Sequence, residues 1–411
     1  MSVVLESIGG VTPAFMGGVT LPGRVAGRGR SVCMAVTRPA FTVGIEEEYL
    51  LVDPETRDLV TDPPETLLAE CEEILGSQIS PEFLRAQIEV GTVVCEDIAS
   101  AGEDLRRLRR GVCGVAESHG LAVIAASTHP FANWSDQQVT PRDRYEMLAR
   151  DLQVVVRRLV ICGMHVHVGI EEPDLRIDLM SQVAYFLPHI LALSTSSPFW
   201  QGHDTGLKSY RMSVFRSMPR TGLPEQFATW GEYERHVDVL VRAGLIEDAT
   251  KLWWDVRPSA RYPTLEMRIP DICTRVDDGI TVAAVYLSLL AMLFRRRSEN
   301  QRWRTYADML VSENVWRAQR YGVEESLADF GKGELVPYAE LVEEIIDLIS
   351  DDARELGCLA EVVRAREIAA EGTSADRQLA VFRAAIDAGA EEVDAARAVV
   401  DELIADTKVG L

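Results

Sequence analysis

The chain has 411 residues, of which 47% are hydrophobic and 26% are charged, an ordinary composition for a large globular protein. Acidic residues outnumber basic ones, giving a formal net charge of -22. A surface this acidic repels the phosphate backbone, so nucleic acids are excluded as partners, whereas a nucleotide bridged through Mg²⁺ is not.

Residues 1–39 differ from the rest of the chain, because they are rich in Gly, Val and Arg and show no periodic apolar pattern. They also lack the order of segments that marks a secretory signal. We expect a flexible N-terminal extension over 1–39, followed by a single domain over 40–411.

From residue 41 onward, patterns of period two alternate with helical patterns, which predicts an α+β domain. The expected strands or extended segments cover 42–52, 83–96, 121–127, 164–170, 252–257 and 264–269. The expected helices cover 65–76, 99–119, 142–161, 174–194, 230–243 and 278–297, and the chain is expected to be helical from about 300. Between them, 196–224 is a long loop rich in Gly, Pro and aromatic residues, and loops of that length inside a domain are usually functional.

Two further patterns bear on the location of the protein. The longest apolar stretch, Ile280 to Phe294, is too short to span a bilayer comfortably, so we expect a buried core helix and no membrane association. Seven cysteines are scattered singly with no CxxC pair, which is typical of reduced thiols in a cytoplasmic protein.

Glu46 and Glu48 lie in the apolar strand TVGIEEEYLLVD. Alternate residues of a strand share a face, so these two carboxylates point the same way. Glutamate is a poor strand former, and two parallel carboxylates repel each other unless a cation lies between them. The motif alone allows either a metal site or a solvated edge strand.

The segment MHVHVG places His165 and His167 on one face of another strand. Two histidines at this spacing are typical of metal ligands or of donors to phosphate. The same HxH pattern occurs in zinc hydrolases, so a binuclear metal-dependent hydrolase of an amide or phosphoester is an alternative at this point.

Two more strands carry charged residues among apolar neighbours. Glu266 and Arg268 share a face in TLEMRIPD, a pattern that also fits a simple ion pair, and Glu89 stands alone in QIEVGT. The long loop adds Lys208 and Arg211, and Arg257 follows in WWDVRP.

The residue types favour phosphate chemistry when they are taken together. Several glutamates supply the hard oxygen ligands that suit Mg²⁺ or Mn²⁺. Only four lysines are present, so arginine, whose planar fork pairs with carboxylates and phosphates, must carry most of the anion binding. The chain lacks GxxxxGK[ST], so a nucleotide would be bound through metals and arginines rather than through a phosphate loop. This combination is suited to phosphoryl transfer.

Four segments in order, GIEEEYLLVDPET, HVHVG, SPFWQGHDTGLKSYR and WWDVRPSARYPTLEMRIPD, resemble the glutamate–cysteine ligase type 2 family, whose members are described as carboxylate–amine ligases. The resemblance covers about residues 41–300 and continues more faintly to about 390. It implies a fold similar to glutamine synthetase: a curved antiparallel sheet, backed by helices, whose concave face forms the active site.

The resemblance also implies a reaction. ATP would phosphorylate the γ-carboxylate of an amino acid such as glutamate, and an amine such as cysteine would displace the phosphate. A cytoplasmic homodimer acting on small molecules follows by the same analogy. A non-catalytic binding protein that retains the fold is the remaining alternative.

The site residues that this resemblance implies fall into three groups. Metal binding is assigned to Glu46, Glu48, Glu89 and Glu266; cofactor binding to His165, His167, Arg257 and Lys208; and catalysis to Arg268 and Arg211.

Overall fold

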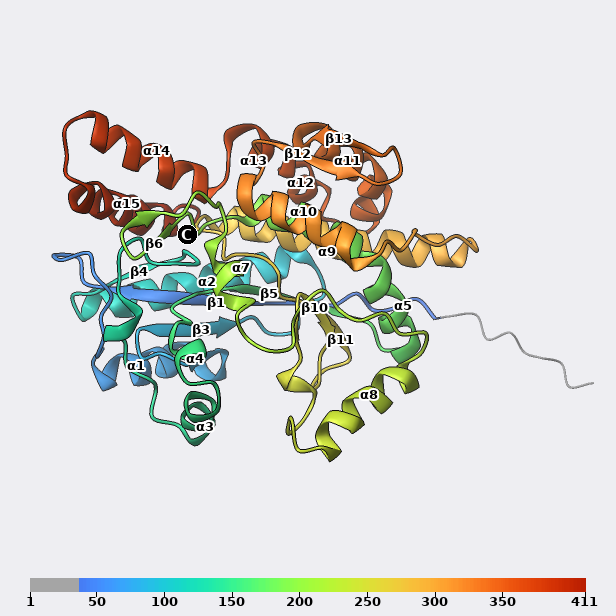
Figure 1. The fold of residues 1–411 in the computed structure, drawn as a ribbon, viewed down its shortest axis with the longest axis horizontal. Coiled ribbons are helices and arrows are strands. Elements are labelled where there is room, and N and C mark those ends of the chain that lie inside the picture. The colour runs from blue at the N-terminus through green and yellow to red at the C-terminus, as the bar shows by residue number, and fades with distance from the viewer. Residues whose placement is uncertain (1–36) are drawn as a thin grey trace, which may run out of the picture. The chain divides into compact units, whose positions relative to one another are not determined.

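The structure, a computed structural model, describes residues 37–411. The expected extension therefore lies outside the described residues, apart from 37–39, and its flexibility stays a prediction. Residues 38–411 form one compact unit built around a seven-stranded sheet (Figure 1). All strand pairs in that sheet are antiparallel, in the order β10-β11-β5-β1-β3-β2, and β4 pairs with the far end of β1.

The strands of this sheet are mostly short, and β1 is the longest of them. They are β1 (Val43–Val52), β2 (Ile79–Pro81), β3 (Gln87–Gly91), β4 (Ala122–Ile124), β5 (Met164–Gly169), β10 (Val256–Pro258) and β11 (Thr264–Met267). Three two-stranded pairs lie outside it: β6 (Phe199–Trp200) with β7 (His203–Asp204), β8 (Thr221–Gly222) with β9 (Trp253–Trp254), and β12 (Ser326–Asp329) with β13 (Glu334–Pro337).

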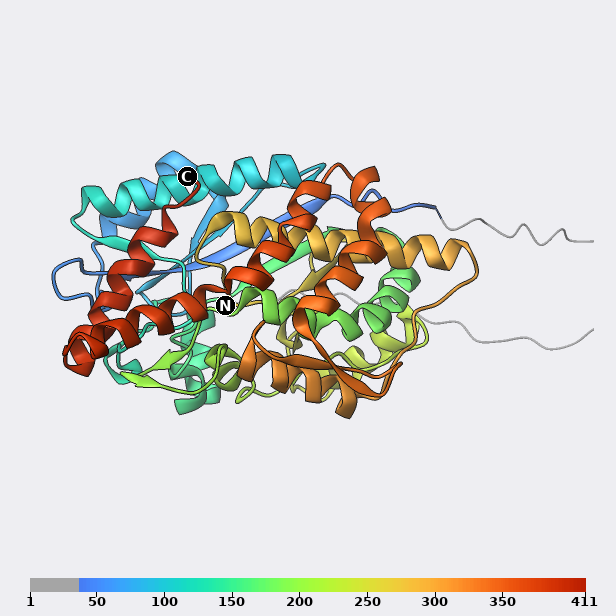
Figure 2. The same ribbon diagram turned by 90° about the horizontal axis from the view of Figure 1, so that it is seen from above.

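Helices lie on both sides of the sheet (Figures 1 and 2). Those before residue 200 are α1 (Glu65–Leu75), α2 (Ile98–Ser118), α3 (Asp143–Leu152), α4 (Val154–Arg157), α5 (Pro173–Val183) and α6 (Leu187–Ser194). Those after it are α7 (Tyr210–Phe215), α8 (Trp230–Arg242), α9 (Val276–Ser298), α10 (Asp308–Tyr321), α11 (Tyr338–Glu355), α12 (Leu359–Val363), α13 (Ala365–Glu371), α14 (Ser374–Asp387) and α15 (Glu392–Thr407).

Two predicted helices are interrupted. The helix expected over 142–161 ends at Leu152, because Gln153 takes a left-handed conformation with φ 51°, and only the short α4 follows. The β-branched run that begins at Val154 favours helix weakly, and α4 is accordingly only four residues long. The helix expected over 174–194 divides into α5 and α6 around a 3₁₀ turn, since Pro188 cannot donate a backbone hydrogen bond.

The sequence predicts a helical chain from about residue 300, and this prediction is wrong over residues 326–337. A hairpin of β12 and β13 interrupts the helical region, and Asp329 fixes the turn by accepting the N–H groups of Gly331 and Lys332. A carboxylate that binds backbone N–H groups two and three residues ahead favours a turn over a helix.

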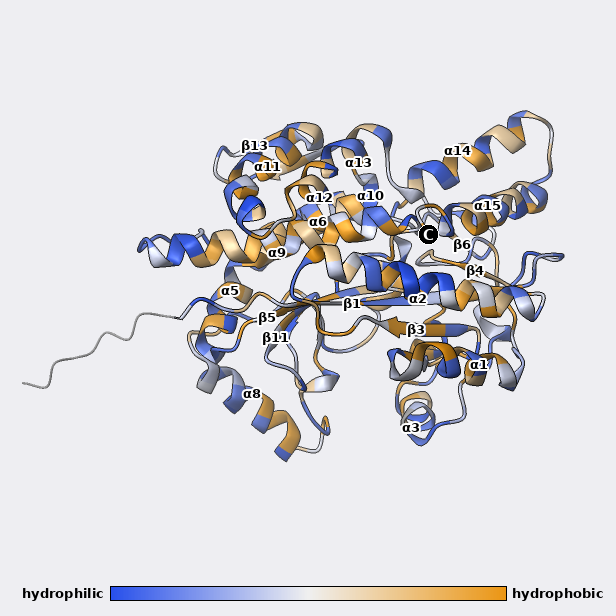
Figure 3. Cartoon of the chain, turned by 180° about the vertical axis from the view of Figure 1, so that it is seen from behind, coloured by the Kyte–Doolittle hydropathy of each residue, from blue (hydrophilic) through white to orange (hydrophobic). Residues whose placement is uncertain are grey.

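Helix α9 forms the centre of the core, as expected for its apolar sequence. Figure 3 shows it as hydrophobic over most of its length, ending in the hydrophilic Arg295–Arg297 segment. Within the described part of the chain, two helical segments, Pro173–Ser194 and Val276–Ser298, are long and apolar enough to cross a membrane. Their apolar windows are 83% and 94% buried inside this protein, the burial typical of core helices.

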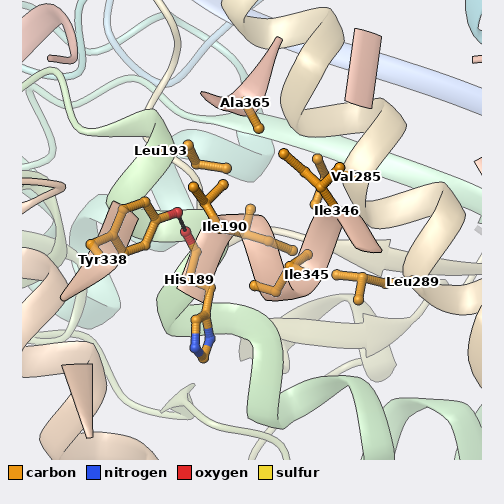
Figure 4. Close-up of a pocket in the computed structure, with 10 residues that line it drawn as sticks. His189, Ile190, Leu193, Val285, Leu289, Tyr338, Ile345, Ile346 and Ala365 are labelled. Carbon is orange, nitrogen blue, oxygen red and sulfur yellow. Dashed lines mark hydrogen bonds between the residues drawn. The ribbon is translucent and has the colours of Figure 1, made fainter. Parts of the chain in front are cut away.

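Next to α9, the helical layer encloses a small apolar cavity of about 10 Å³ (Figure 4). It is lined by side chains of α6, α9, α11 and α13, and at its edge the Tyr338 hydroxyl donates to the His189 carbonyl, 2.7 Å away. A space this small holds at most one water molecule, so it is a packing feature.

The sheet face that carries Glu47 is covered by α2. Glu47 and Arg109 form an ion pair in which both side chains are 0% exposed; the Glu47 oxygens lie 2.7 and 3.1 Å from guanidinium nitrogens. The Tyr49 hydroxyl donates to the same carboxylate at 2.5 Å, and Arg109 also donates to the carbonyls of Cys273 and Thr274. This network joins β1, α2 and the segment that leads into α9.

The C-terminal segment forms hydrogen bonds and ion pairs with residues that lie much earlier in the sequence. The Ala125 N–H, just after β4, donates to the Thr407 hydroxyl at 2.9 Å. Asp406 accepts from Arg275 and Arg377, so α15 is joined to the beginning of α9.

Candidate active site on the open sheet face

The predicted site residues meet on one face of the sheet, because of how the strands are aligned. Directly opposed residues of an antiparallel pair share a face. Glu46 opposes His165 and Glu48 opposes Glu89, while Glu266 opposes both His167 and Arg257. Residues 43–49 of β1 alternate between fully and partly buried, so Glu46 and Glu48 share the more open face and Glu47 points into the core.

Glu46 bridges the two histidines of β5. One of its oxygens lies 3.1 Å from His165 Nδ1 and the other 3.4 Å from His167 Nε2. Burial disfavours the charged carboxylate, but hydrogen bonds and charge from both histidines outweigh burial and lower the pKa of Glu46. Burial and the nearby charge of Arg268 lower the pKa of His165 to about 4. Glu46 is therefore ionised and His165 neutral near pH 7.

Glu48 and Glu89 face each other in a more crowded, acidic part of the site. Glu48 accepts the Gly163 N–H at 2.7 Å, and burial together with the charge of Glu82 raises its pKa to about 7. Burial, and then the charges of Glu82, Glu46 and Glu48, raise the pKa of Glu89 well above its ordinary value. These carboxyl groups repel one another, and a cation between them would relieve that repulsion.

Glu266 is the buried partner of two arginines. Two Arg257 nitrogens, Nε and Nη2, each donate to a Glu266 oxygen at 3.0 Å, and Arg268 donates to Glu266 as well. Burial opposes ionisation of Glu266, but Arg268 and then Arg257 outweigh burial and lower its pKa. Arg257 further donates to the carbonyls of Thr250 and Leu252, so its contacts orient Glu266 and join β10 to the preceding segment.

Arg211, on α7, reaches the site from the loop that the sequence marked as functional. Its guanidinium donates at 3.0 Å to the carbonyls of Arg268 and Ile269 and lies 3.8 Å from Asp271. Burial lowers the pKa of Arg211.

Replacing Gly163 by alanine tests the packing of Arg211. A methyl group there would lie 2.5 Å from Arg211 Nη2, so the guanidinium must shift and lose its carbonyl contacts. We expect a loss of about 2 kcal/mol in the free energy of unfolding, measured by urea denaturation. The matched control is Gly44→Ala in β1, whose methyl would meet only the His167 Cβ at an ordinary 3.8 Å. Equal stability of the two variants would contradict the proposed contact.

Lys208 lies apart from this group. Its ammonium pairs with Asp376, at the beginning of α14, and with Glu324 at 3.1 Å. The structure places it between the long loop and the helical layer, and its role in cofactor binding stays a prediction.

Glu82, which the sequence does not predict as a site residue, lies close to Glu48 and Glu89 in the structure. Glu82 follows β2, and its carboxylate accepts from the Tyr145 hydroxyl at 3.1 Å. It lies in no periodic strand pattern, so no local signal marked it.

A pocket of about 140 Å³ opens beside Glu48. Residues of the sheet, of α7 and of the segment 251–253 line one part of it, and residues of α3 and of the segments next to it in the chain or in space line the rest. The lining includes Glu48, Glu82, Phe83, Tyr145, Leu148, Leu159, Ile161, His165, Arg211, Phe215, Lys251, Trp253 and Arg268.

The site contains side chains of the types that bind metals, but these side chains are not arranged around a common point. Among residues 37–411, no group of three or more His, Cys, Asp or Glu side chains is positioned to hold a metal ion. Glu46 is turned toward the histidines and Glu266 toward the arginines. The same region of the chain has six cysteines, all buried and free of disulfides, and they form no thiolate metal centre either.

Solved structures identify the class of fold. A glutamate–cysteine ligase from Francisella tularensis, solved in complex with AMP, superposes with a TM-score of 0.63 at 14% identity, covering 91% of this chain and 90% of that one. A bifunctional glutathione synthetase from Pasteurella multocida gives 0.64 at 15% identity, covering 89% and 52%. The expected α+β, glutamine-synthetase-like fold with an antiparallel sheet is confirmed.

The sequence comparison gives the family. The Glutamate-cysteine ligase family 2 (GCS2) matches residues 42–401, and the chain belongs to this family. A protein of Rhodospirillum rubrum named "Putative glutamate--cysteine ligase 2" is 62% identical over 373 residues, covering 90% of this chain and 96% of its own. A namesake from a Jannaschia species is 55% identical over 371 residues, covering 90% and 98%. The chain is thus an ATP-dependent carbon–nitrogen ligase, as its motifs predicted, rather than a hydrolase.

Proposed function

We propose that this ligase joins the γ-carboxylate of glutamate, or of a similar amino acid, to an amine through an acyl phosphate. The observation that carries the proposal is the strand alignment that gathers Glu46, Glu48, Glu89 and Glu266 with two histidines on one face. The names of the relatives and the AMP bound by the Francisella enzyme support it.

The chemistry has two balanced steps. The carboxylate oxygen attacks the γ-phosphorus of ATP, a new P–O bond forms, and ADP leaves. The amine nitrogen then attacks the acyl carbon, the C–O bond to phosphate breaks, and the departing phosphate takes the proton that the nitrogen loses. Both steps gather negative charge on phosphoryl oxygens, so fixed positive groups accelerate them.

Arg268 and Arg211 are the groups proposed for that task. Arg268 lies between Glu266 and the pocket, and its pKa is raised because Glu266 outweighs the effect of burial. Arg211 lines the same pocket and is oriented by two carbonyls. His165 and His167 would contact the phosphates or a metal from β5, the strand between β1 and β11.

The donor atoms of the opposed pair Glu48 and Glu89 suit a hard divalent cation. Glu48 and Glu89 oppose each other and repel, and burial and like charge raise both pKa values, which is the environment that a cation would neutralise. We propose that Glu46, Glu48, Glu89 and Glu266 bind Mg²⁺, or Mn²⁺ in its place. The bound ion would offset phosphate charge in the transition state. The cytoplasmic location and the homodimer stay predictions.

The test is an ADP-release assay of the purified protein with Mg²⁺-ATP, over amino acids paired with amines. We expect ADP only when acid and amine are both present, and no ADP after EDTA treatment. Hydroxylamine as the amine should trap the acyl phosphate as a hydroxamate. ADP formed without acid, or no ADP with any pair, would contradict the proposal. Glutamate with cysteine is the first pair to measure.

A further inference from the structure

Asp271 is a fully buried carboxylate next to the site, and the proposed reaction assigns it no role. It lies in the segment between β11 and α9. Its oxygens accept three hydrogen bonds: from the Ser196 N–H at 3.0 Å and the Ser197 hydroxyl at 2.7 Å on Oδ2, and from the Ser209 hydroxyl at 2.8 Å on Oδ1. Since an ionised carboxylate only accepts, this environment satisfies its charged form.

The same carboxylate fixes both the backbone and the guanidinium of Arg211. The Arg211 N–H donates to the Ser197 hydroxyl oxygen at 3.1 Å, and that hydroxyl donates in turn to Asp271. The guanidinium itself lies 3.8 Å from Asp271 Oδ1. Ser209, which directly precedes α7, is bonded to the same oxygen, so the beginning of the helix that carries Arg211 is held as well.

Arg211 requires a counter-charge because it is buried near a second arginine. Burial lowers the pKa of Arg211, the charge of Asp271 is the largest effect that opposes burial, and Arg268 adds to the lowering. Asp255, another fully buried aspartate of this region, is already paired with Arg216 at 2.8 Å. Asp271 is therefore the buried acid that offsets the charge of Arg211.

The backbone around Asp271 is fixed by other parts of the fold. Asp271 pairs with Gly163 in an antiparallel bridge, and the N–H of Ile272 donates to the Ser127 hydroxyl at 2.8 Å. Gly163 also donates to Glu48 on β1. Groups that stabilise charge in a transition state are most effective when they are held in place beforehand, and a carboxylate on this frame can hold an arginine in that way.

We propose that Asp271 is the positioning residue of Arg211, and that it keeps the guanidinium directed at the pocket without touching the substrate itself. Arg211 lines that pocket and Asp271 does not, so Asp271 acts through Arg211 alone. This inference rests on the proposed function, because it takes Arg211 as a group that neutralises the transferring phosphoryl group.

The test is Asp271→Asn, which keeps the shape of the side chain. The Ser196 N–H can only donate, so the amide oxygen takes the place of Oδ2 and the NH₂ group that of Oδ1, 3.8 Å from the guanidinium. Two donors then face each other. We expect crystal structures of wild type and variant to show the Arg211 guanidinium displaced from the carbonyls of Arg268 and Ile269, which accept it at 3.0 Å in the wild type.

The kinetic counterpart is a split between kcat and KM. We expect Asp271→Asn to lower kcat for ADP release about tenfold or more and to leave KM for the acid nearly unchanged, as for an interaction made in the transition state. Calorimetric titration with Mg²⁺-ADP counts the binding-competent molecules, and kcat is expressed per competent molecule. In an Arg211→Met background, Asp271→Asn should have almost no further effect on kcat, because the group that it positions is gone.

The matched control is Asp278→Asn. Asp278 is also buried and paired with an arginine, Arg364 at 2.7 Å, but it lies at the beginning of α9 on the covered side of the sheet. This control should keep the wild-type kcat. If Asp271→Asn does not fold, Ser197→Ala replaces it, since that variant removes only the hydroxyl between the carboxylate and the Arg211 N–H, and kcat should fall about fivefold.

The outcomes separate a positioning role from a general structural one. If the guanidinium keeps both carbonyl contacts in the variant, or if kcat falls by the same factor in the Arg211→Met background, the proposal is wrong. An equal loss of kcat in Asp278→Asn would contradict it as well. If the wild type releases no ADP with any acid and amine, the ligase reaction is contradicted instead, and the crystal structures still decide whether Asp271 positions Arg211.

Discussion

Replacing Glu46 by glutamine is expected to lower ATP-dependent ligation on the order of a hundredfold or more, the scale seen when one preorganised electrostatic group is removed from an active site. Glu46 bridges His165 and His167 and is one of the proposed metal ligands. The amide keeps the size and one acceptor oxygen but removes the charge. Steady-state rates of ADP release, with saturating acid and amine, measure the effect.

The matched control for this variant is Glu55→Gln. Glu55 is exposed in the turn that follows β1, so it has the same side chain on the same segment without contact to the site. The control should retain the full rate. A Glu46→Gln enzyme with unchanged rate and unchanged Mg²⁺ dependence would remove Glu46 from the catalytic site.

Replacing Arg109 by methionine is expected to cost about 3–5 kcal/mol in the free energy of unfolding, because it leaves the Glu47 carboxylate buried without its counter-charge. Both side chains are 0% exposed, so water cannot take the place of the guanidinium. Urea denaturation with global fitting of the midpoint and slope measures this loss.

The double variant Glu47→Gln, Arg109→Met separates the buried charge from the lost packing. Glutamine at 47 still accepts the Tyr49 hydroxyl but carries no charge, so the double variant should regain at least half of the stability lost by Arg109→Met. If the two losses are equal, the cost comes from the shape of Arg109 and its carbonyl contacts rather than from the unpaired carboxylate.

The strands of the site could be predicted because their signal is local. Because alternate residues of a strand share a face, the strand assignment alone predicted that Glu46 points the same way as Glu48, and His165 the same way as His167. The register between the strands could not be predicted from local patterns. Glu46 opposes a residue 119 positions away, and neither strand's sequence indicates which residues of the other it pairs with. The family resemblance supplied that long-range information.

Other features were missed for the same physical reason. In the sequence, Arg109 is one of several arginines in α2 and cannot be distinguished from those that face solvent. Only the packed structure shows that it neutralises Glu47. Glu82 lies in the short connection after Pro81, where no repeating sequence pattern indicates which way its side chain points. The break at Gln153 depends on a single left-handed residue that propensity does not mark.

The strand order also constrains how this chain is made. β1 emerges early from the ribosome, but its neighbour β5 pairs in turn with β11, whose last residue follows the end of β1 by more than two hundred positions. At about 5–20 residues per second, the edge of the nascent sheet waits roughly 10–40 s for that strand. Thr407, which accepts from the chain after β4, is translated later still. An unpaired strand edge exposed for that time is an aggregation hazard, so yield in a recombinant host should depend on chaperone supply and on slow, cool expression.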